Sequence, residues 1–319
     1  MIALRRVLCP VDFSNSSRRA LDYASALAGW YGAQLSVLYI VPINGVMDVP
    51  AVRLDERERS LVLERLQMFA GAVPSTVPLD LQVDEAAEIH TAILSRAADT
   101  QTDLLVLGTH GRSGLRRLML GSVTERVLRS TPCATLVVPP LATELLPTQP
   151  VRFQHIVCPT DFSTGSNAAV GCALSLAQQA DAELLLLHVI EVPPEMREHP
   201  ATSRIDVDAI RAAAEAEALR RLRELVPDAA RKFCTVETAV AEGAADHAIL
   251  TACAARNADL VVIGASHHGV LDRILFGSVA ARVTRAAPCP VLIVPARSSV
   301  RARVTAPTLR AIGNPITAV

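Results

Sequence analysis

Short apolar runs alternate with longer amphipathic stretches along the first half of the chain. In the stretch 16–31, apolar side chains recur at three-to-four spacing, at Ala20, Tyr23, Ala24 and Leu27. That spacing predicts the buried stripe of a helix, whereas short uninterrupted runs of Val, Leu and Ile predict strands buried on both faces. Strands are therefore expected at 6–9, 34–41, 79–83, 104–107 and 134–138, and helices at 16–31, 56–70, 87–98 and 122–129.

The predicted helix 56–70 carries a second apolar stripe. We expect its inward-facing side chains to be Leu61, Leu63, Leu66 and Phe69. Strands that alternate with helices in this way are typical of a parallel sheet covered by helices on both faces. Ligands of such a sheet bind at the carboxyl ends of its strands. The residues that follow each strand are therefore the first place to look for chemistry.

The chain contains two copies of one sequence pattern. The string RVLCPVDFS at 6–14 returns as HIVCPTDFS at 155–163, and a longer segment at 104–140 returns at 260–296. The offset grows from 149 to 156 residues between these pairs, so the second copy holds about seven additional residues. We expect them in the proline-bearing stretch 191–206. A length of 319 residues also suits two domains.

The repeat predicts the domain organisation. We expect a first domain at 1–140, a linker at 141–152, a second domain at 153–297 and a flexible tail at 298–319. The last strand of each copy, 134–138 or 291–294, is apolar and ends at a proline. Because an exposed apolar edge invites aggregation, we predict that the two copies pair through these strands, and that isolated copies would dimerise in the same way.

Composition and charge exclude several classes of protein. Hydrophobic residues make up 50% of the chain, aromatic residues only 3%, and the formal net charge is −1. This apolar fraction excludes a disordered chain, and the lack of aromatic platforms and of a basic field argues against nucleic-acid binding. No apolar run reaches the length of a membrane span, and Pro10 and Asp12 leave no room for a signal-peptide core. We therefore expect a cytoplasmic protein without a membrane partner.

Cysteine usage points to a reducing environment. The chain has seven cysteines, an odd number, and none form a Cys-x-x-Cys pair. Most lie within apolar stretches, as Cys9, Cys158, Cys172 and Cys253 do. We expect buried thiols, with a metal site or a redox switch as the alternatives.

Two repeated features lie at predicted strand ends. Asp12 and Asp161 close the first strand of their copies, each within a Pro-x-Asp-Phe-Ser string. Gly108 closes the fourth strand of the first copy, and Gly111 follows it. Glycine permits a close backbone approach to a ligand that a Cβ atom would prevent, although glycines at strand ends also serve simply to turn the chain.

A further glycine begins the next helix. Gly121 and Ser122 open it, so its free N–H groups and positive dipole end favour an anion. Ser122 and Glu125 also match a capping box. The combination predicts a phosphate cradle that is not a P-loop and offers no catalytic lysine. The loop before Gly121 adds three cationic side chains, Arg112, Arg116 and Arg117.

Taken together, the pattern Gly-x2-Gly-x9-Gly-Ser, the Pro-x-Asp-x-Ser opening and the closing string TPCATLVVP resemble the universal stress protein family. The resemblance covers both copies and leaves out only the linker and the tail. It implies an α/β fold of two tandem, doubly wound (Rossmann-like) domains, each with a five-stranded parallel sheet in the order 3-2-1-4-5, joined as an intramolecular pseudo-dimer. Many members bind ATP or another adenine nucleotide, and members without the glycine signature do not.

The resemblance also implies a nucleotide site in each copy. The aspartate would contact the adenosine, the residues that close the second strand would meet the adenine through backbone groups, and the glycines and serine would hold ribose and phosphates. In the first copy these residues are Asp12, Ile40, Val41, Gly108, Gly111, Arg112, Gly121, Ser122 and Val123. In the second copy they are Asp161, Val189, Gly264, His267, Gly277, Ser278 and Val279.

The second copy departs from the family pattern in its glycine loop. His267 stands where the first copy has Gly111, and Asp272 stands where it has Arg116. A side chain then projects where the backbone would approach phosphate, and one positive charge becomes negative. We expect weaker binding of a polyanion in the second copy, although a protonated histidine can bind phosphate. A metal site at His267 and His268 is the remaining alternative.

Three classes of function compete. The first is a regulatory stress-response protein that binds an adenine nucleotide, ATP with or without Mg²⁺, and changes its association with a protein partner. The second is an ATPase; beyond Asp12 and Asp161 there is no repeated carboxylate for Mg²⁺ and no dedicated base, so at most slow hydrolysis is expected. The third is a ligand-free scaffold. We expect the first class, a binding protein and not an enzyme, with a homodimer through the final strands as an added assembly.

Overall fold

The computed structural model describes residues 3–43, 53–109, 120–145, 151–191, 207–228, 230–267, 274–275 and 277–296. Of Val207, Ser266, His267 and the short segment 274–275, it describes only the backbone. The predicted site residues Gly111 and Arg112 and the predicted tail 298–319 lie outside the described residues, and so does nearly all of the stretch 191–206.

The first domain alternates strands and helices along its described length. Every strand and helix expected from the hydrophobic pattern is present, with ends that differ by a few residues. Its elements are β1 (Arg6–Val11), α1 (Asn15–Tyr31), β2 (Gln34–Pro42), α2 (Glu56–Ala70), β3 (Leu79–Ala86), α3 (Ile89–Asp99), β4 (Leu104–Gly108), α4 (Ser122–Leu128) and β5 (Ala134–Val138).

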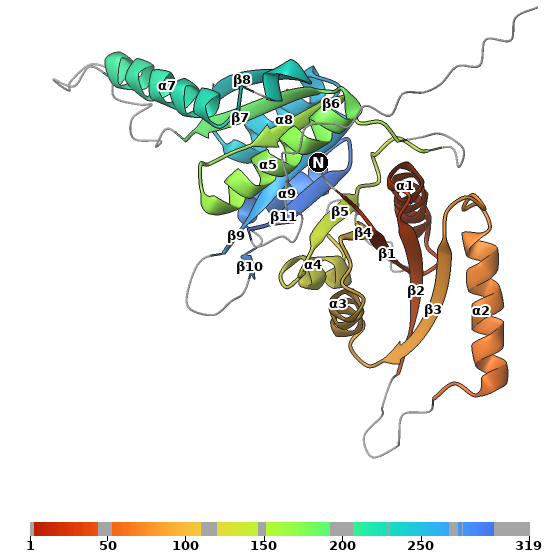
Figure 1. The fold of residues 1–319 in the computed structure, drawn as a ribbon. Helices are drawn as coiled ribbons and strands as arrows, with labels where there is room; N and C mark the ends of the chain where they lie inside the picture. Colours follow the sequence, from red (N-terminus) through yellow and green to blue (C-terminus); the bar gives the residue numbers. More distant parts are fainter. Residues whose placement is uncertain are drawn as a thin grey trace, which may run out of the picture.

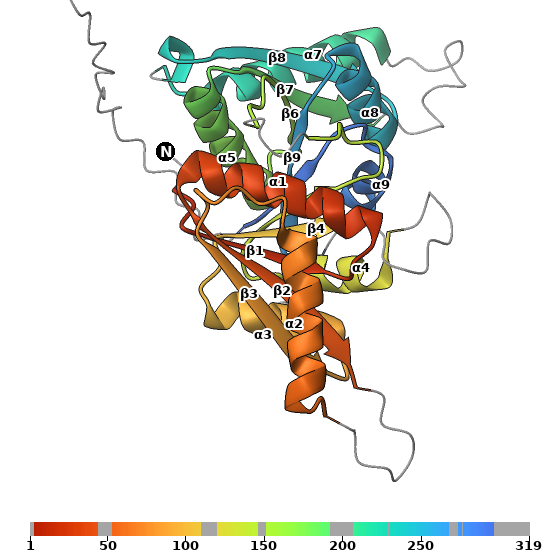
Figure 2. The same ribbon diagram turned by 90° about the vertical axis from the view of Figure 1, so that its right-hand side faces the viewer.

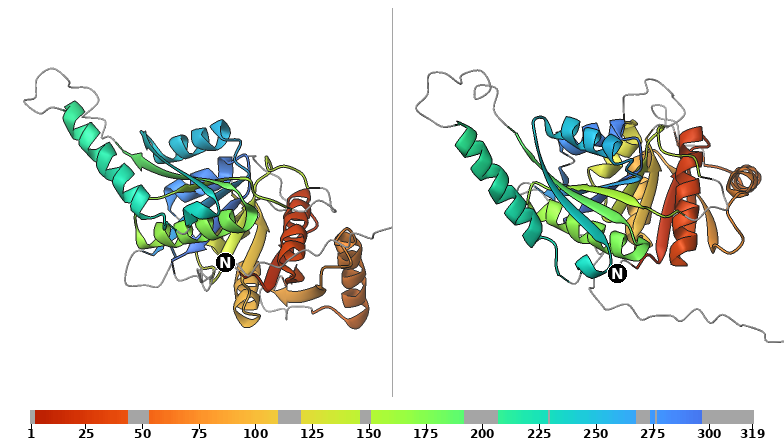
Figure 3. Two further views of the ribbon diagram at one scale, coloured as in Figure 1. Left: turned by 45° about the horizontal axis from the view of Figure 1, so that its top comes forward. Right: turned by 90° about the horizontal axis from the view of Figure 1, so that it is seen from above.

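The second domain repeats this order and adds two short elements, a 3₁₀ turn η1 and a strand β10. Its elements are β6 (His155–Pro159), α5 (Thr164–Ala180), β7 (Glu183–Ile190), α7 (Val207–Glu224), η1 (Ala230–Lys232), β8 (Thr235–Glu242), α8 (Ala245–Ala255), β9 (Leu260–His267), β10 (Ile274–Leu275), α9 (Ser278–Ala286) and β11 (Val291–Pro295). Helix α7 projects outward from the margin of this domain (Figure 3).

The strands of both domains form one sheet (Figure 1), in the order β3-β2-β1-β4-β5-β11-β9-β6-β7-β8. Each half has the order 3-2-1-4-5 and is parallel throughout its own main strands. The predicted doubly wound fold is confirmed. The sheet has 11 strands, where ten were expected, because β10 pairs antiparallel to the end of β9.

The two halves meet where β5 pairs with β11. This contact is antiparallel and sets Leu136 opposite Leu292 and Val137 opposite Val291. All four side chains are buried. The predicted intramolecular pseudo-dimer through the final strands is therefore confirmed. Because β5 lies between β4 and β11, and β11 between β5 and β9, neither strand keeps a free edge, and the expected homodimer through these same strands would require the seam to open.

Helices cover both faces of the continuous sheet (Figure 2). Side chains from α1, α2, α5 and α7 pack into one apolar cluster that includes Leu136 and Leu292. Side chains from α3, α4, α8 and α9 form two clusters on the other face. Since the first cluster draws residues from both domains, the core passes through the seam instead of ending at it.

Polar contacts fasten the domains and the linker together. The Tyr31 hydroxyl of α1 donates to Gln179 of α5 at 2.8 Å. After β5 the chain is held against α1, because the Arg19 guanidinium contacts the Pro140 carbonyl and the Glu144 carboxylate, and the Tyr23 hydroxyl lies 3.0 Å from the Thr143 carbonyl.

Two local expectations about helices are wrong. Leu61 does not face inward but is 58% exposed, because the face of α2 that packs against the core is formed by Val62, Leu63, Leu66, Phe69 and Ala70. Ser122 forms no capping box: Gly121 is the N-cap of α4, and Glu125 pairs with Arg129 at 2.6 Å. A serine one position inside the helix cannot return its hydroxyl to the N3 amide as a capping residue does.

The cysteine prediction is confirmed in its structural part, because all seven thiols are free and buried. Within the described part of the chain, no three His, Cys, Asp or Glu side chains gather as a metal would require. None of the described helices is both long and apolar enough to cross a membrane.

The shared core makes a prediction about cooperativity. Leu136→Ala should destabilise both domains together by about 2–5 kcal/mol, because Leu136 is only 1% exposed and lies at the seam. Leu141→Ala, at a site that is 70% exposed, should change stability by less than about 0.5 kcal/mol. Urea unfolding followed by circular dichroism measures both. Two separate transitions, only one of them shifted, would contradict a common core.

Candidate functional site

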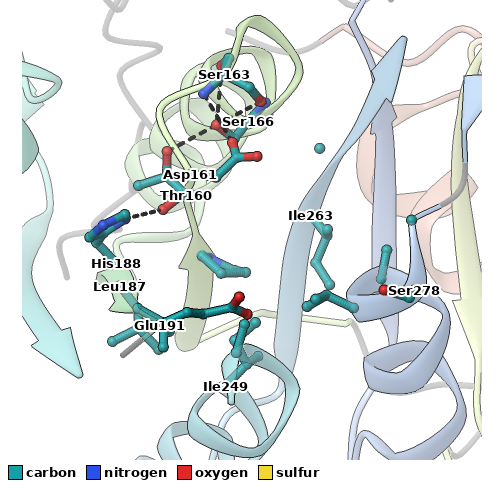
Figure 4. Close-up of a pocket in the computed structure, with 17 residues that line it drawn as sticks. Thr160, Asp161, Ser163, Ser166, Leu187, His188, Glu191, Ile249, Ile263 and Ser278 are labelled. Carbon is teal, nitrogen blue, oxygen red and sulfur yellow. Dashed lines mark hydrogen bonds between the residues drawn. The ribbon is translucent and has the colours of Figure 1, made fainter. Parts of the chain in front are cut away.

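A pocket of about 470 Å³ opens at the carboxyl edge of the second domain's sheet (Figure 4). That volume lies within the range of about 300–1,000 Å³ typical of small-molecule sites. Its walls come from the ends of β6, β7 and β9 and from the starts of α8 and α9. The lining residues are Pro159, Thr160, Asp161, Ser163, Ser166, Leu187, His188, Val189, Glu191, Ala245, Ile249, Ile263, Gly264, Gly277, Ser278, Val279 and Ala280.

The second-domain residues singled out from the sequence meet at this pocket. Six of them line it, namely Asp161, Val189, Gly264, Gly277, Ser278 and Val279. The backbone of His267 ends β9 nearby in sequence, but its side chain is outside the described residues. Sequence reasoning missed Glu191 and the apolar wall formed by Leu187, Ile249 and Ile263; periodicity identifies such side chains as buried or exposed but not as neighbours.

The first-domain residues occupy the equivalent positions of their own sheet. Asp12 follows β1, Ile40 and Val41 lie near the end of β2, Gly108 ends β4, and Gly121 caps α4 ahead of Ser122 and Val123. The start of α4 is fastened to the end of β4, because Thr124 Oγ1 donates to the Gly108 carbonyl at 2.8 Å and the Gly121 amide donates to the Thr109 carbonyl at 2.7 Å.

Asp161 is held in place by the turn that begins α5. Its Oδ1 accepts the Ser163 amide at 2.9 Å, and the Ser163 hydroxyl accepts the Ser166 amide at 3.2 Å as the cap of α5. Burial opposes ionisation of Asp161, but hydrogen bonds from Ser163 and Ser166 outweigh it and lower its pKa. The carboxylate is therefore ionised at neutral pH and can accept donors such as sugar hydroxyls.

Phe162, beside Asp161, has a strained backbone. Its φ is 63°, in the left-handed region that bulky side chains avoid at a cost of about 1–3 kcal/mol. The ring is held between two partners: His188 at 4.5 Å between ring centroids, and the Arg221 guanidinium at 3.9 Å from the ring centre. His188 Nδ1 also lies 2.8 Å from the Thr160 carbonyl.

The first domain has the same arrangement. Phe13 has a φ of 65°, its ring lies 4.5 Å from that of Tyr39, and Arg65 stacks on it at 4.2 Å. The Asp12 carboxylate accepts the Ser14 amide at 3.0 Å. The repeated Asp-Phe-Ser string was the signal for this turn, but a positive φ at phenylalanine is not what a propensity argument would suggest.

The glycines of the second-domain site have different structural roles. A Cβ on Gly264 would collide with the Gly165 backbone and come within 2.6 Å of the Ser166 nitrogen, so this glycine lets α5 approach β9. Gly108 is the same case, with the Ser16 carbonyl oxygen 2.8 Å from the added atom. A Cβ on Gly277 would meet nothing within 4 Å, and its φ of −62° suits any residue. Packing therefore explains the first two glycines but not Gly277.

Helix α9 brings unpaired backbone donors to the pocket. Gly277 is its N-cap, no side chain caps it, and the first intrahelical amide is that of Ala281, which donates to the Gly277 carbonyl at 2.9 Å. The preceding residues Ser278, Val279 and Ala280 line the pocket and have no intrahelical acceptor. This helix start favours an acceptor or an anion.

The charged side chains of the described lining are the carboxylates Asp161 and Glu191, with His188 as a titratable neighbour, and no Lys or Arg is among them. Arg282 of α9 is paired instead with Asp246 at 2.9 Å. Positive potential in the described part of the pocket therefore comes from the starts of α8 and α9, neither of which has a side-chain cap.

Comparison with known proteins identifies the family. The model of the universal stress protein family matches residues 3–139 and again 152–295. The chain belongs to the universal stress protein family. The family predicted from the glycine loop and the Asp-Phe-Ser string is thus confirmed.

Several relatives resemble one domain or both. Universal stress protein MJ0531 of Methanocaldococcus jannaschii is 32% identical over 142 residues, 44% of this chain and 82% of that protein. YxiE of Bacillus subtilis is 30% identical over 144 residues, 42% of this chain and 97% of that protein. A universal stress protein of Mycolicibacterium smegmatis is 25% identical over 306 residues, 90% of this chain and 96% of that protein.

Solved structures share the fold of the whole chain. A universal stress protein from Archaeoglobus fulgidus has a TM-score of 0.62 at 18% identity and covers 91% of this chain and 98% of its own. One from Pseudomonas aeruginosa, described as a putative universal stress protein, has a TM-score of 0.60 at 18% identity, covering 92% and 94%.

The packing role of Gly264 can be tested by adding one methyl group. Gly264→Ala should destabilise the chain by about 1–3 kcal/mol, because the new Cβ overlaps backbone atoms that cannot swing aside. Gly171→Ala is the control: it lies in α5, the helix that packs against Gly264 of β9, its added Cβ atom meets nothing within 4 Å, and it should be neutral or stabilising by about 0.5–1 kcal/mol. Thermal unfolding compares the two variants. Equal melting temperatures would show that the packing of α5 against β9 does not need a glycine at position 264.

The lowered pKa of Asp161 predicts a pH dependence. Asp161→Asn should lower the melting temperature at pH 7, and the loss should shrink as the pH falls through the folded-state pKa, because a carboxyl with a lowered pKa stabilises the fold only while ionised. Asp208→Asn on the exposed surface of α7 is the control. Melting temperatures between pH 3 and 7 measure the difference, and a constant offset would contradict the assignment.

Proposed function

We propose that this universal stress protein binds an adenine nucleotide at the carboxyl edge of each half of its sheet and acts as a regulatory protein. The observation that carries the proposal is the second-domain pocket, in which Asp161, Gly277 and Ser278 face one space from different elements. Figure 4 shows the Asp161 carboxylate and the Ser278 side chain directed into it.

Each part of the pocket suits one part of a nucleotide. Leu187, Ile249 and Ile263 offer apolar walls for a flat base, and the β7 backbone at Val189 offers hydrogen bonds to its edge. The ionised Asp161 would accept ribose hydroxyls. The free amides at the start of α9 would bind phosphate oxygens, and Gly277 would let them approach closely.

The described side chains favour binding over catalysis. Phosphoryl transfer needs metal ions or cations on the transferring group and a positioned base. In the described lining, Asp161 already accepts a backbone amide and no Lys or Arg is present. Mg²⁺ is usually held by one or two carboxylates together with phosphates, so an ion arriving with the nucleotide would depend mainly on the phosphates.

Regulation would follow from the difference between the empty and the filled site. A ligand that binds only the folded chain stabilises it, and any partner that contacts the rim of the pocket then meets an altered surface. We propose the partner only as a protein that binds this rim.

Gly277 provides the sharpest test of the nucleotide proposal. Gly277→Val has open space for its Cβ atom and should stay folded, losing only the preference of an N-cap for glycine over valine, about 0.5–1 kcal/mol, yet it should block phosphate approach at one site. Equilibrium dialysis with labelled ATP should therefore count one nucleotide fewer per chain for this variant than for the wild type. Gly171→Ala, remote from the pocket and equally unobstructed, should bind as the wild type does.

Two results would overturn the proposal. One is a wild-type chain that binds no adenine nucleotide at saturating concentration. The other is a Gly277→Val variant that stays folded and binds ATP with the wild-type number and affinity, since the α9 start would then not hold the phosphates.

A further inference from the structure

Glu191 follows the last residue of β7 and lines the second-domain pocket. Figure 4 shows its carboxylate directed into the pocket, which Ile249 also lines. The Glu191 side chain makes no hydrogen bond or ion pair with any residue in the described ranges. Because this carboxylate has no partner in the described ranges, its oxygens can accept a hydrogen bond from a donor on a ligand.

The position of Glu191 follows from the alternation of β7. Leu187 and Val189 pack with the cluster on the α8 side of the sheet. His188 points to the other face, where it meets Phe162 and the Thr160 carbonyl. Since side chains of a strand alternate, Glu191 shares the pocket face with Leu187 and Val189. It therefore borders the space that the base of a bound nucleotide would occupy.

The two domains differ at this position. The residue equivalent to Glu191 in the first domain is Pro42, at the same offset as the two Asp-Phe-Ser strings. Proline has no side-chain donor or acceptor, so this position of the first domain presents no carboxylate to the base edge. A carboxylate accepts hydrogen bonds and donates none. It therefore binds a ligand that carries an amino group more tightly than one whose ring edge has no donor.

We propose that Glu191 is a specificity-determining residue that makes the second-domain pocket select purine nucleotides carrying an exocyclic amino group on the base. The inference rests on the proposed nucleotide function and deepens it. The amino group would donate to the Glu191 carboxylate, the base would lie against Ile249 and Leu187, and the ribose would reach Asp161. The first domain, with Pro42, would bind without this preference.

The test removes the amino group from the ligand and the carboxylate from the protein separately. Binding of adenosine 5′-monophosphate and of purine riboside 5′-monophosphate, which differs only by lacking the 6-amino group, is measured by calorimetry. All chains carry Asp12→Ala, so that the first-domain site is weakened. With Glu191 present, the amino-bearing ligand should bind about tenfold more tightly, the value of one well-formed charge-assisted hydrogen bond.

In Glu191→Ala the two ligands should bind within about twofold of each other, because only the amino-bearing ligand loses a hydrogen bond in this variant. Glu183→Ala, at the exposed beginning of the same strand, should keep the tenfold preference. Both replaced side chains are exposed, so both variants are expected to fold.

The failures are distinguishable. A preference that persists in Glu191→Ala, or one that is absent while Glu191 is present, overturns the specificity inference and leaves the nucleotide proposal standing. Binding of neither ligand, by this chain or by the chain with Asp12 intact, overturns both.

Discussion

The antiparallel pairing of β5 with β11 is the contact on which the rest of the structure depends. It turns two parallel half-sheets into one sheet and joins the apolar cluster beneath α1 and α5 across the boundary. A parallel sheet with an exposed apolar edge strand is prone to aggregation, and the last strand of each half covers that edge of the other half. The seam lies away from the pocket at the carboxyl edge of the second domain, whose described lining contains no residue of β5 or β11.

The two copies share a framework but differ in sequence at positions expected to contact a ligand. Both retain a phenylalanine at positive φ after the aspartate, an aromatic or imidazole partner for its ring and a stacked arginine. Both retain a tightly packed glycine at the end of the fourth main strand. Among the positions expected to contact a ligand, the sequences differ at Glu191 and His267, which stand in place of Pro42 and Gly111. The repeated framework constrains the position of the site while its ligand preference can diverge.

The strained turn at Phe162 connects the shared framework to the pocket of the second domain. Its ring is clamped between β7 and α7, and its backbone fixes the aspartate before it and the capping serine after it. Strain of this kind persists only where surrounding contacts over-determine the conformation. The clamp therefore keeps the acceptor at the pocket edge in one orientation before any ligand arrives.

The sequence by itself determined the repeat, the order of strands and helices and the location of the chemistry at strand ends, because apolar periodicity and glycine spacing are local properties. It also indicated the seam, since two apolar edge strands need partners. Only the tertiary structure decided that Gly264 is a packing glycine, that Leu61 is exposed and that Glu191 borders the pocket. Each of these depends on which side chains from distant segments come together, and a pattern read along one chain contains no distances between segments.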